Sequence, residues 1–132
     1  LSTGDETNVA RAISAKIGLN NFYADLLPED KVAIIEKEIE KKLTNIVKHH
    51  DGLCLKWVCP GWAGVPDRIV LLPGGKVIFV ELKRPKGGVI SSRQKWWADK
   101  LKVLGFHHYY IYNEVELRMV EMEIRVAGAL RR

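Results

Sequence analysis

Residues 64–84, GVPDRIVLLPGGKVIFVELKR, read as two apolar runs joined by a short turn. The runs at 67–72 and 76–83 are rich in Val, Ile and Leu and are bounded by Pro and Gly, a pattern typical of strands. Pro-Gly-Gly at 73–75 has the length of a three-residue hairpin loop. The stretch therefore predicts an antiparallel hairpin, whose register decides which side chains share a face of the sheet.

The predicted register gathers three charges on one sheet face. Counting outward from the loop pairs Leu72 with Lys76 and places Asp67 opposite Glu81. Lys83 lies one side-chain step beyond Glu81 on the same face. The other side chains of this face are apolar: Ile69, Leu71, Val77 and Phe79. Two carboxylates side by side on a covered face repel, so one must take up a proton or find a cation. We expect a divalent metal there; the alternative is a surface ion-pair ladder on an exposed face.

The rest of the chain predicts helices around a four-stranded sheet, in the order helix, helix, three meandering strands, helix, strand, helix. Asn113 with Glu116 three residues later resembles a capping box, which favours a C-terminal helix. No repeat or Gly/Ser linker divides the 132 residues, so we expect one compact domain at 29–132 after a helical extension at 1–28. The expected helices are 5–17, 28–47, Ser91 or Ser92 through Leu104, and 113–130; the expected strands are 53–59, 67–72, 76–83 and 106–112.

Composition narrows the class of protein. With 47% hydrophobic and 28% charged residues the chain is of ordinary globular type, and no apolar run approaches the roughly 18 to 20 residues of a membrane span. The N-terminus lacks a signal-peptide layout, so we expect an intracellular, cytoplasmic protein with no membrane partner. Cys54 and Cys59 are predicted to be free, half-buried thiols. The net charge of +5 favours an anionic partner such as nucleic acid.

The motifs GVPD and ELK, separated by 13 residues, resemble the PD-(D/E)XK signature of restriction-endonuclease-like nucleases. The longer run LKWVCPGWAGVPDRIVLLPGGKVIFVELKRPKGGVISSRQKWW, after a Glu-bearing helix and before LGF, is similar to the VRR-NUC domain in its small standalone form of phages and bacteria. The similarity covers about residues 33–112. It implies an α/β, restriction-endonuclease-like core with a central mixed four-stranded sheet flanked by helices, extended here by N- and C-terminal helices. It also implies Mg²⁺ or Mn²⁺ and cleavage of branched DNA.

The resemblance assigns roles residue by residue. It implies metal ligands at Asp67 and Glu81 with the Leu82 carbonyl, and an acid on the first core helix. At about 100° per residue Glu36 falls inside the apolar arc of that helix and Glu40 just outside it, so Glu36 is the choice and Glu40 the fallback, with an ordinary solvated Glu as the alternative. Gln94 shares the apolar stripe of its helix, as a site residue or as a satisfied core amide. The implied catalytic set is Glu36, Asp67, Glu81, Lys83 and Gln94.

Five basic residues surround the expected site and could contact phosphates, which would position a duplex without reading its sequence. The alternative is that they only keep these loops soluble. They are Arg68, Arg84, Lys86, Arg93 and Lys95.

An exposed aromatic face suggests a second subunit. Trp96 and Val103 fall on the helix face opposite Gln94, where a tryptophan needs a cover: a partner subunit or the C-terminal helix. We expect further apolar surface for an interface at Leu117, Val120 and Ile124. The resemblance also implies a homodimer, since a four-way junction must be cut on two strands and a two-fold pair supplies two sites.

These features predict a metal-dependent, structure-selective DNA endonuclease that acts at four-way (Holliday) junctions as a homodimer. Two alternatives stay open. One is a monomeric flap or single-strand nuclease. The other is a non-catalytic DNA-binding module, which the intact set of Asp67, Glu81 and Lys83 argues against.

Overall fold

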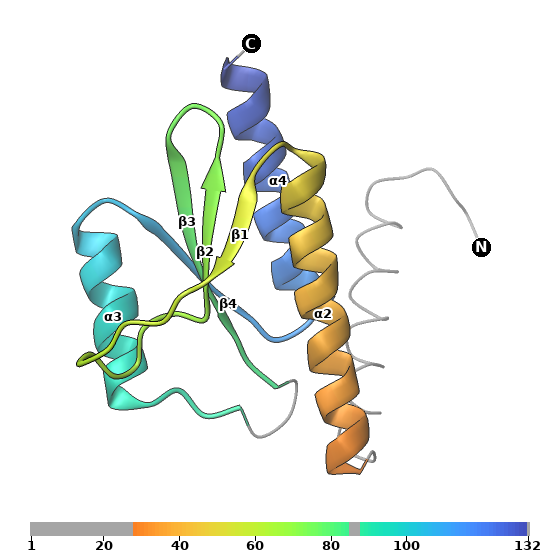
Figure 1. Cartoon of the computed structure of the whole chain (residues 1–132), viewed down its shortest axis with the longest axis vertical. Coiled ribbons are helices and arrows are strands. Elements are labelled where there is room, and N and C mark those ends of the chain that lie inside the picture. The colour runs from red at the N-terminus through yellow and green to blue at the C-terminus, as the bar shows by residue number, and fades with distance from the viewer. Residues whose placement is uncertain (1–27, 85–87, 132) are drawn as a thin grey trace, which may run out of the picture.

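The computed structural model describes residues 28–84 and 88–131 (Figure 1). Strands β1 to β3 form an antiparallel meander, and β4 joins beside β3 in parallel, so the sheet is mixed and has the order β1-β2-β3-β4. This confirms the predicted fold class; the expected helix at 5–17 lies outside the described residues. The elements are α2 (Glu29–His49), β1 (Leu53–Lys56), β2 (Arg68–Leu72), β3 (Lys76–Leu82), α3 (Ser92–Val103), β4 (His107–Ile111) and α4 (Glu114–Arg131).

The hairpin register is confirmed where the strands pair. Leu72 lies opposite Lys76, and the ladder runs to Arg68 opposite Val80. Gly74 and Gly75 in the loop take positive φ angles of 83° and 79°, which a glycine adopts without steric cost. Asp67 itself lies one residue before β2 begins. Its position opposite Glu81 continues the register beyond the last backbone pair.

Strand β1 is shorter than the predicted 53–59. It ends at Lys56, and only one further bond, from Trp57 N–H to the Asp67 carbonyl at 3.0 Å, extends the ladder. Pro60 has no N–H to donate, and Gly61 takes a φ of 85°, so the chain leaves the sheet here. Residues 57–66 therefore form a loop. Its first residue, Trp57, is hydrogen-bonded to Asp67, and its last residue directly precedes Asp67.

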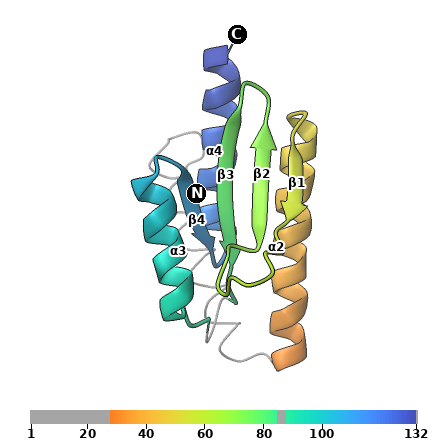
Figure 2. The ribbon, with the colours of Figure 1, turned by 60° about the vertical axis from the view of Figure 1, so that its left-hand side comes forward.

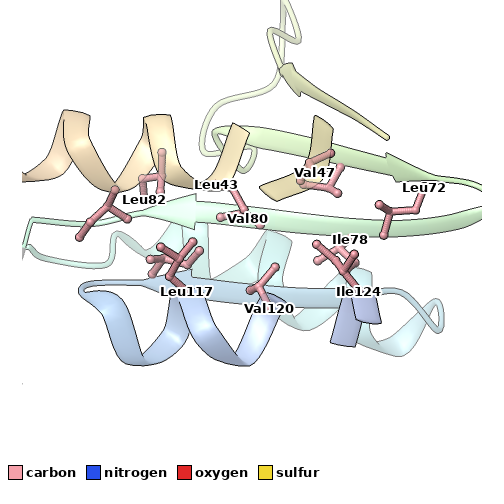
Figure 3. Close-up of a cluster of buried hydrophobic side chains, with 12 residues drawn as sticks. Leu43, Val47, Leu72, Ile78, Val80, Leu82, Leu117, Val120 and Ile124 are labelled. Atoms are coloured by element: carbon pink, nitrogen blue, oxygen red, sulfur yellow. The ribbon is translucent and has the colours of Figure 1, made fainter. Parts of the chain in front are cut away.

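The core lies on one face of the sheet. Helices α2 and α4 pack together against this face, while α3 lies beside β4 (Figures 1 and 2). On the opposite face Leu53 and Leu55 of β1 are exposed, whereas Phe79 and Glu81 of β3 are buried. Figure 3 shows side chains of both helices meeting those of β2 and β3. Each such buried aliphatic side chain contributes roughly 1.5–3 kcal/mol. The core residues include Leu43, Val47, Val70, Leu72, Ile78, Val80, Leu82, Leu117, Val120 and Ile124.

The C-terminal helix corrects one expectation about the subunit interface. Leu117, Val120 and Ile124 are buried against the sheet, so they are core residues and offer no surface to a second subunit. The helix starts as a variant of the predicted capping box. Asn113 Oδ1 accepts a hydrogen bond from Val115 N–H at 2.9 Å, and Glu116 Oε1 accepts from Tyr112 N–H, not from Asn113, at 3.0 Å.

We expect Leu43→Ala to destabilise the protein by about 2–5 kcal/mol, because it leaves a cavity where α2, α4 and the sheet meet. The control is Ile34→Ala on the same helix, where the side chain is 50% exposed; its cost should stay within about 0.5 kcal/mol. Urea unfolding followed by circular dichroism measures both. Equal costs for the two variants would contradict the assignment of this face as the core.

Candidate active site

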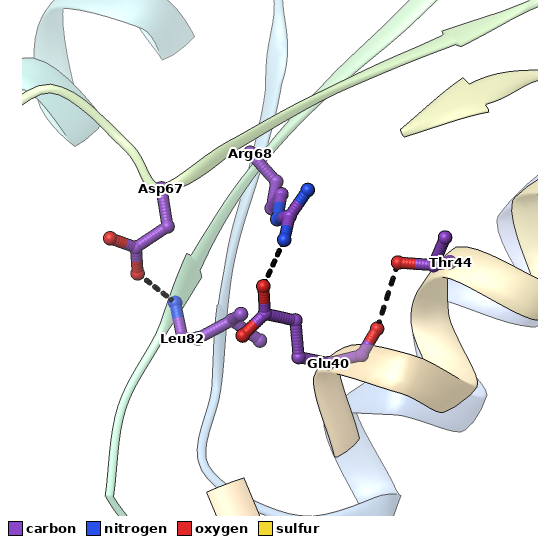
Figure 4. A network of polar contacts seen from close by, with 5 residues as sticks. All are labelled: Glu40, Thr44, Asp67, Arg68 and Leu82. Carbon is purple, nitrogen blue, oxygen red and sulfur yellow. Dashed lines mark hydrogen bonds and ion pairs between the residues drawn. The ribbon is translucent and has the colours of Figure 1, made fainter. Parts of the chain in front are cut away.

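Two carboxyl groups meet at the open end of the β2–β3 hairpin. Asp67 Oδ2 accepts a hydrogen bond from the backbone N–H of Leu82 at 2.8 Å, so the Asp67 side chain reaches across to β3 (Figure 4). Arg68 points to the other side, toward Glu40 on α2. The Asp67 side chain thus completes the ladder at the end of β3 and is fixed beside Glu81.

Glu81 is buried, with 3% of its surface exposed. Burial raises the pKa of Glu81 from 4.5 to about 8, assisted by a hydrogen bond with Asp67 and by its charge, while Lys83 opposes the shift. Without a cation, therefore, Glu81 holds a proton at neutral pH. This is one of the two outcomes that the register predicted for the paired carboxyl groups.

Gln94 links Glu81 to Lys83. Its Nε2 donates to Glu81 Oε1 at 3.2 Å, and its Oε1 accepts from Lys83 Nζ at 2.6 Å. Lys83 Nζ also donates to the carbonyl of Val89 at 2.9 Å. These two hydrogen bonds fix the Lys83 ammonium group beside Gln94, which itself contacts Glu81. The structure brings together four of the predicted site residues: Asp67, Glu81, Lys83 and Gln94.

Helix α3 begins with the residues that fix Gln94. Ser91 Oγ accepts from Gln94 N–H at 3.2 Å, and Gln94 Oε1 accepts from Ser91 N–H at 3.0 Å, which makes a complete capping box. The structure thus selects Ser91 over Ser92 as the cap. The roles of Ser91 and of the Val89 carbonyl were not predicted. The role of Ser91 could have been predicted from the Ser-x-x-Gln spacing at 91–94, which is the sequence pattern of a capping box.

The acids of α2 lie apart from this cluster. Glu36 forms an ion pair with Arg84, 3.6 Å from Oε2 to Nε, and Glu40 pairs with Arg68. Within the described ranges, no three His, Cys, Asp or Glu side chains are grouped closely enough to hold a metal ion. The structure therefore does not join Glu36 to Asp67 and Glu81. Its role as a ligand stays a prediction.

The predicted DNA-binding residues have varied surroundings. Arg68 is largely covered, Arg84 pairs with Glu29 and Glu36, and Lys95 Nζ lies 3.0 Å from Asp99 Oδ2. Arg93 is exposed on the first turn of α3. Lys86 lies outside the described residues. Among the predicted residues that the structure describes, Arg93 is thus the exposed one with no ion pair to another described residue.

The donor set suits a hard divalent cation. Asp67 and Glu81 present carboxylate oxygens, the ligand type that Mg²⁺ and Mn²⁺ prefer. A cation would also offset the burial and the Asp67 charge that now raise the pKa of Glu81. The residues that could hold it are these two, with the Leu82 carbonyl as the predicted third donor.

Known proteins share this architecture. A solved VRR_NUC domain matches with a TM-score of 0.60 and 23% sequence identity, covering 65% of this chain and 94% of that one. The chain therefore has the fold of a VRR_NUC domain, and the predicted resemblance is confirmed. No protein-family model matches the chain.

Sequence relatives overlap the chain in part. A protein of Acyrthosiphon pisum secondary endosymbiont phage 1, named "Putative nuclease p44", is 54% identical over 52 residues, which are 39% of this chain and 56% of the phage protein. Copper-transporting ATPase 2 of Homo sapiens is 38% identical over 53 residues, 40% of this chain but 4% of the ATPase. The chain thus spans about half of the phage relative. Among the described residues, no helix is long and apolar enough to cross a membrane.

We expect the raised pKa of Glu81 to make stability fall with pH. The folded state keeps a proton that the unfolded chain releases between pH 4.5 and about 8, so the free energy of unfolding decreases across that window. His108, buried with its pKa lowered from 6.5 to about 4, acts in the opposite sense below pH 6.5. Comparison with Glu81→Gln isolates the contribution of Glu81.

The measurement is Tm in EDTA from pH 5 to 9 for both proteins. Relative to Glu81→Gln, the parent protein should lose Tm steadily as pH rises, and added Mn²⁺ at pH 8 should restore it in the parent protein alone. Parallel curves for the two proteins would show that Glu81 titrates normally.

Proposed function

We propose that this protein is a nuclease that hydrolyses phosphodiester bonds in DNA with Mg²⁺ or Mn²⁺. The observation that carries the proposal is the apposition of Asp67 and Glu81, with Gln94 connecting Glu81 to the ammonium group of Lys83. The VRR_NUC fold and the nuclease name of the phage relative support it. The basic net charge of +5 suits a polyanionic substrate.

Each member of the cluster has a physical role in this proposal. Asp67 and Glu81 would hold the cation, which when bound supplies an activated water and neutralises charge on the phosphate. Lys83 is fixed by two acceptors, so its charge is in place before the substrate arrives and can stabilise the negative charge that develops at phosphorus. Gln94 keeps Lys83 oriented and keeps it from pairing directly with Glu81.

We assign four-way (Holliday) junctions as the preferred substrate and a homodimer as the active form. The resemblance to the VRR-NUC domain implies branched DNA, and a single small domain offers one site where a junction needs two cuts. A monomeric flap or single-strand nuclease is the second candidate. It gains support because Leu117, Val120 and Ile124, the α4 residues expected at a dimer interface, lie in the core.

We expect Asp67→Asn, Glu81→Gln and Lys83→Ala each to reduce cleavage by at least about 100-fold. The first two remove a ligand charge and should also weaken Mn²⁺ binding; Lys83→Ala should still bind Mn²⁺ and DNA. The assay is cleavage of junction, flap, duplex and single-stranded DNA with Mg²⁺, Mn²⁺ or EDTA. Lys48→Ala, at the far end of α2, is the control and should cleave normally. Full activity in Asp67→Asn or Glu81→Gln, or cleavage in EDTA, would disprove the proposed chemistry.

The subunit count has its own test. Light scattering should give twice the 15.0 kDa chain mass. A mixed dimer with one Asp67→Asn subunit should nick one strand of a four-way junction, because one of its two sites is inactive. Monomer mass at micromolar concentration, with paired cuts still made, would replace the dimer by the flap-nuclease candidate.

A further inference from the structure

The four tryptophans of the chain form one continuous aromatic cluster. The rings of Trp57 and Trp97 lie 5.4 Å apart, and Trp57 also contacts Phe79 of β3 at 5.4 Å. Trp96 continues the cluster outward and stacks against Trp62, with 6.2 Å between ring centroids and 21° between planes. Trp57 and Trp97 are half-buried, whereas Trp62 and Trp96 are 53% and 45% exposed. The inner rings therefore anchor an outer pair that faces solvent.

The loop that carries Trp62 is held in place at several points. Its ends are joined by the bond from Trp57 N–H to the Asp67 carbonyl, and Trp97 Nε1 donates to the Ala63 carbonyl at 3.0 Å. Gly64 takes a φ of +80° and lies so close to α3 that a Cβ there would be 2.6 Å from Arg93 Cβ. Trp62 is thus fixed beside α3 before any ligand binds, which lowers the entropic cost of binding.

The charge around the outer pair is positive. Helix α3 carries four basic side chains and one acidic, whereas α2 carries five of each and α4 three basic and four acidic. Arg93 and Lys100 stand three residues before and four residues after Trp96, so all three share one stripe of the helix. An anionic ligand is therefore favoured on the α3 side of the molecule and not on the α2–α4 side.

This side is also the side of the candidate active site. Glu81 and Phe79 point to the same face of β3, and the aromatic cluster reaches that face through Trp57. The Trp62 loop ends at Asp67, and α3 supplies Gln94 on the face toward Glu81 and Trp96 on its outer face. A DNA strand that reaches Glu81 past the first turn of α3 can therefore also meet the exposed tryptophans.

We propose that Trp62 and Trp96, flanked by Arg93 and Lys100, form a stacking platform for an unpaired nucleobase. The inference rests on the proposed nuclease function and specifies which part of a branched substrate the protein contacts. Duplex bases are already stacked and hidden, whereas unpaired bases offer a free aromatic face, and stacking on tryptophan tolerates any sequence. The neighbouring guanidinium and ammonium groups would hold the phosphates on either side. A second copy of the chain would instead bring like charges together on this stripe.

The experiment separates stacking from charge. Asp67→Asn protein in EDTA, which should not cleave, is titrated into a labelled dT oligonucleotide and into an abasic oligonucleotide of equal length, with anisotropy as the readout. Adding Trp62→Ala or Trp96→Ala should weaken binding of the dT oligonucleotide about 10-fold or more and leave the abasic one nearly unchanged. Trp62→Phe should restore most of the loss. Lys100→Ala should weaken both and lower the salt dependence.

The matched control is Val103→Ala, which truncates an 80% exposed apolar residue of the same helix and should alter neither affinity. Circular dichroism checks that each variant folds. Equal binding of dT and abasic oligonucleotides by parent and Trp variants alike would overturn the platform. So would a fall from dimer to monomer mass in Trp62→Ala, since the pair would then belong to a subunit interface. Because no cleavage is measured, these results hold whether or not the nuclease proposal survives.

Discussion

The contact between Asp67 and Glu81 is the constraint on which the site depends. Two ionised carboxylates at one covered position would repel, so Glu81 keeps a proton. The protein holds the pair through a backbone N–H that donates to Asp67 and an amide that donates to Glu81. An isolated hairpin would relieve the strain by moving apart. The loop that is bonded to Asp67 and the capped first turn of α3 prevent the two carboxyl groups from separating. The rest of the fold therefore holds together a pair of side chains that would not stay together alone. Such exceptions to good packing are typical of functional sites.

The two faces of the sheet divide stability from function. Val70, Ile78 and Val80 face α2 and α4 and are fully buried, so one face supplies most of the hydrophobic stabilisation. The opposite face is free to carry charges at its end and to stay open over β1 and β2. The aromatic cluster contributes to both stability and binding on this second face. Trp57 packs on Phe79, while Trp62 and Trp96 remain exposed to solvent.

Local sequence signals predicted what depends on local geometry. The length of the Pro-Gly-Gly loop fixed the register, and the spacing of Ser91 and Gln94 contained the helix cap. Partners across long sequence distances were not predictable in this way. The apolar pattern of α4 showed which residues are buried but not what covers them, so Leu117 was wrongly expected at an interface. Helical angles likewise placed Glu36 near the core side of α2 but could not show that Arg84 lies beside it.

The ion pairs of α2 nevertheless discriminate between the two candidate acids. Arg68 and Arg84 directly follow Asp67 and Lys83, and each reaches an acid of α2. The Arg84 and Glu36 side chains are 43% and 32% exposed, and such a pair contributes at most about 1 kcal/mol. The Arg68 side chain is only 19% exposed, so removing Glu40 would leave a largely covered guanidinium unpaired, at greater cost. If an acid of α2 were to bind a cation, releasing Glu36 from Arg84 would therefore cost less free energy than releasing Glu40 from Arg68.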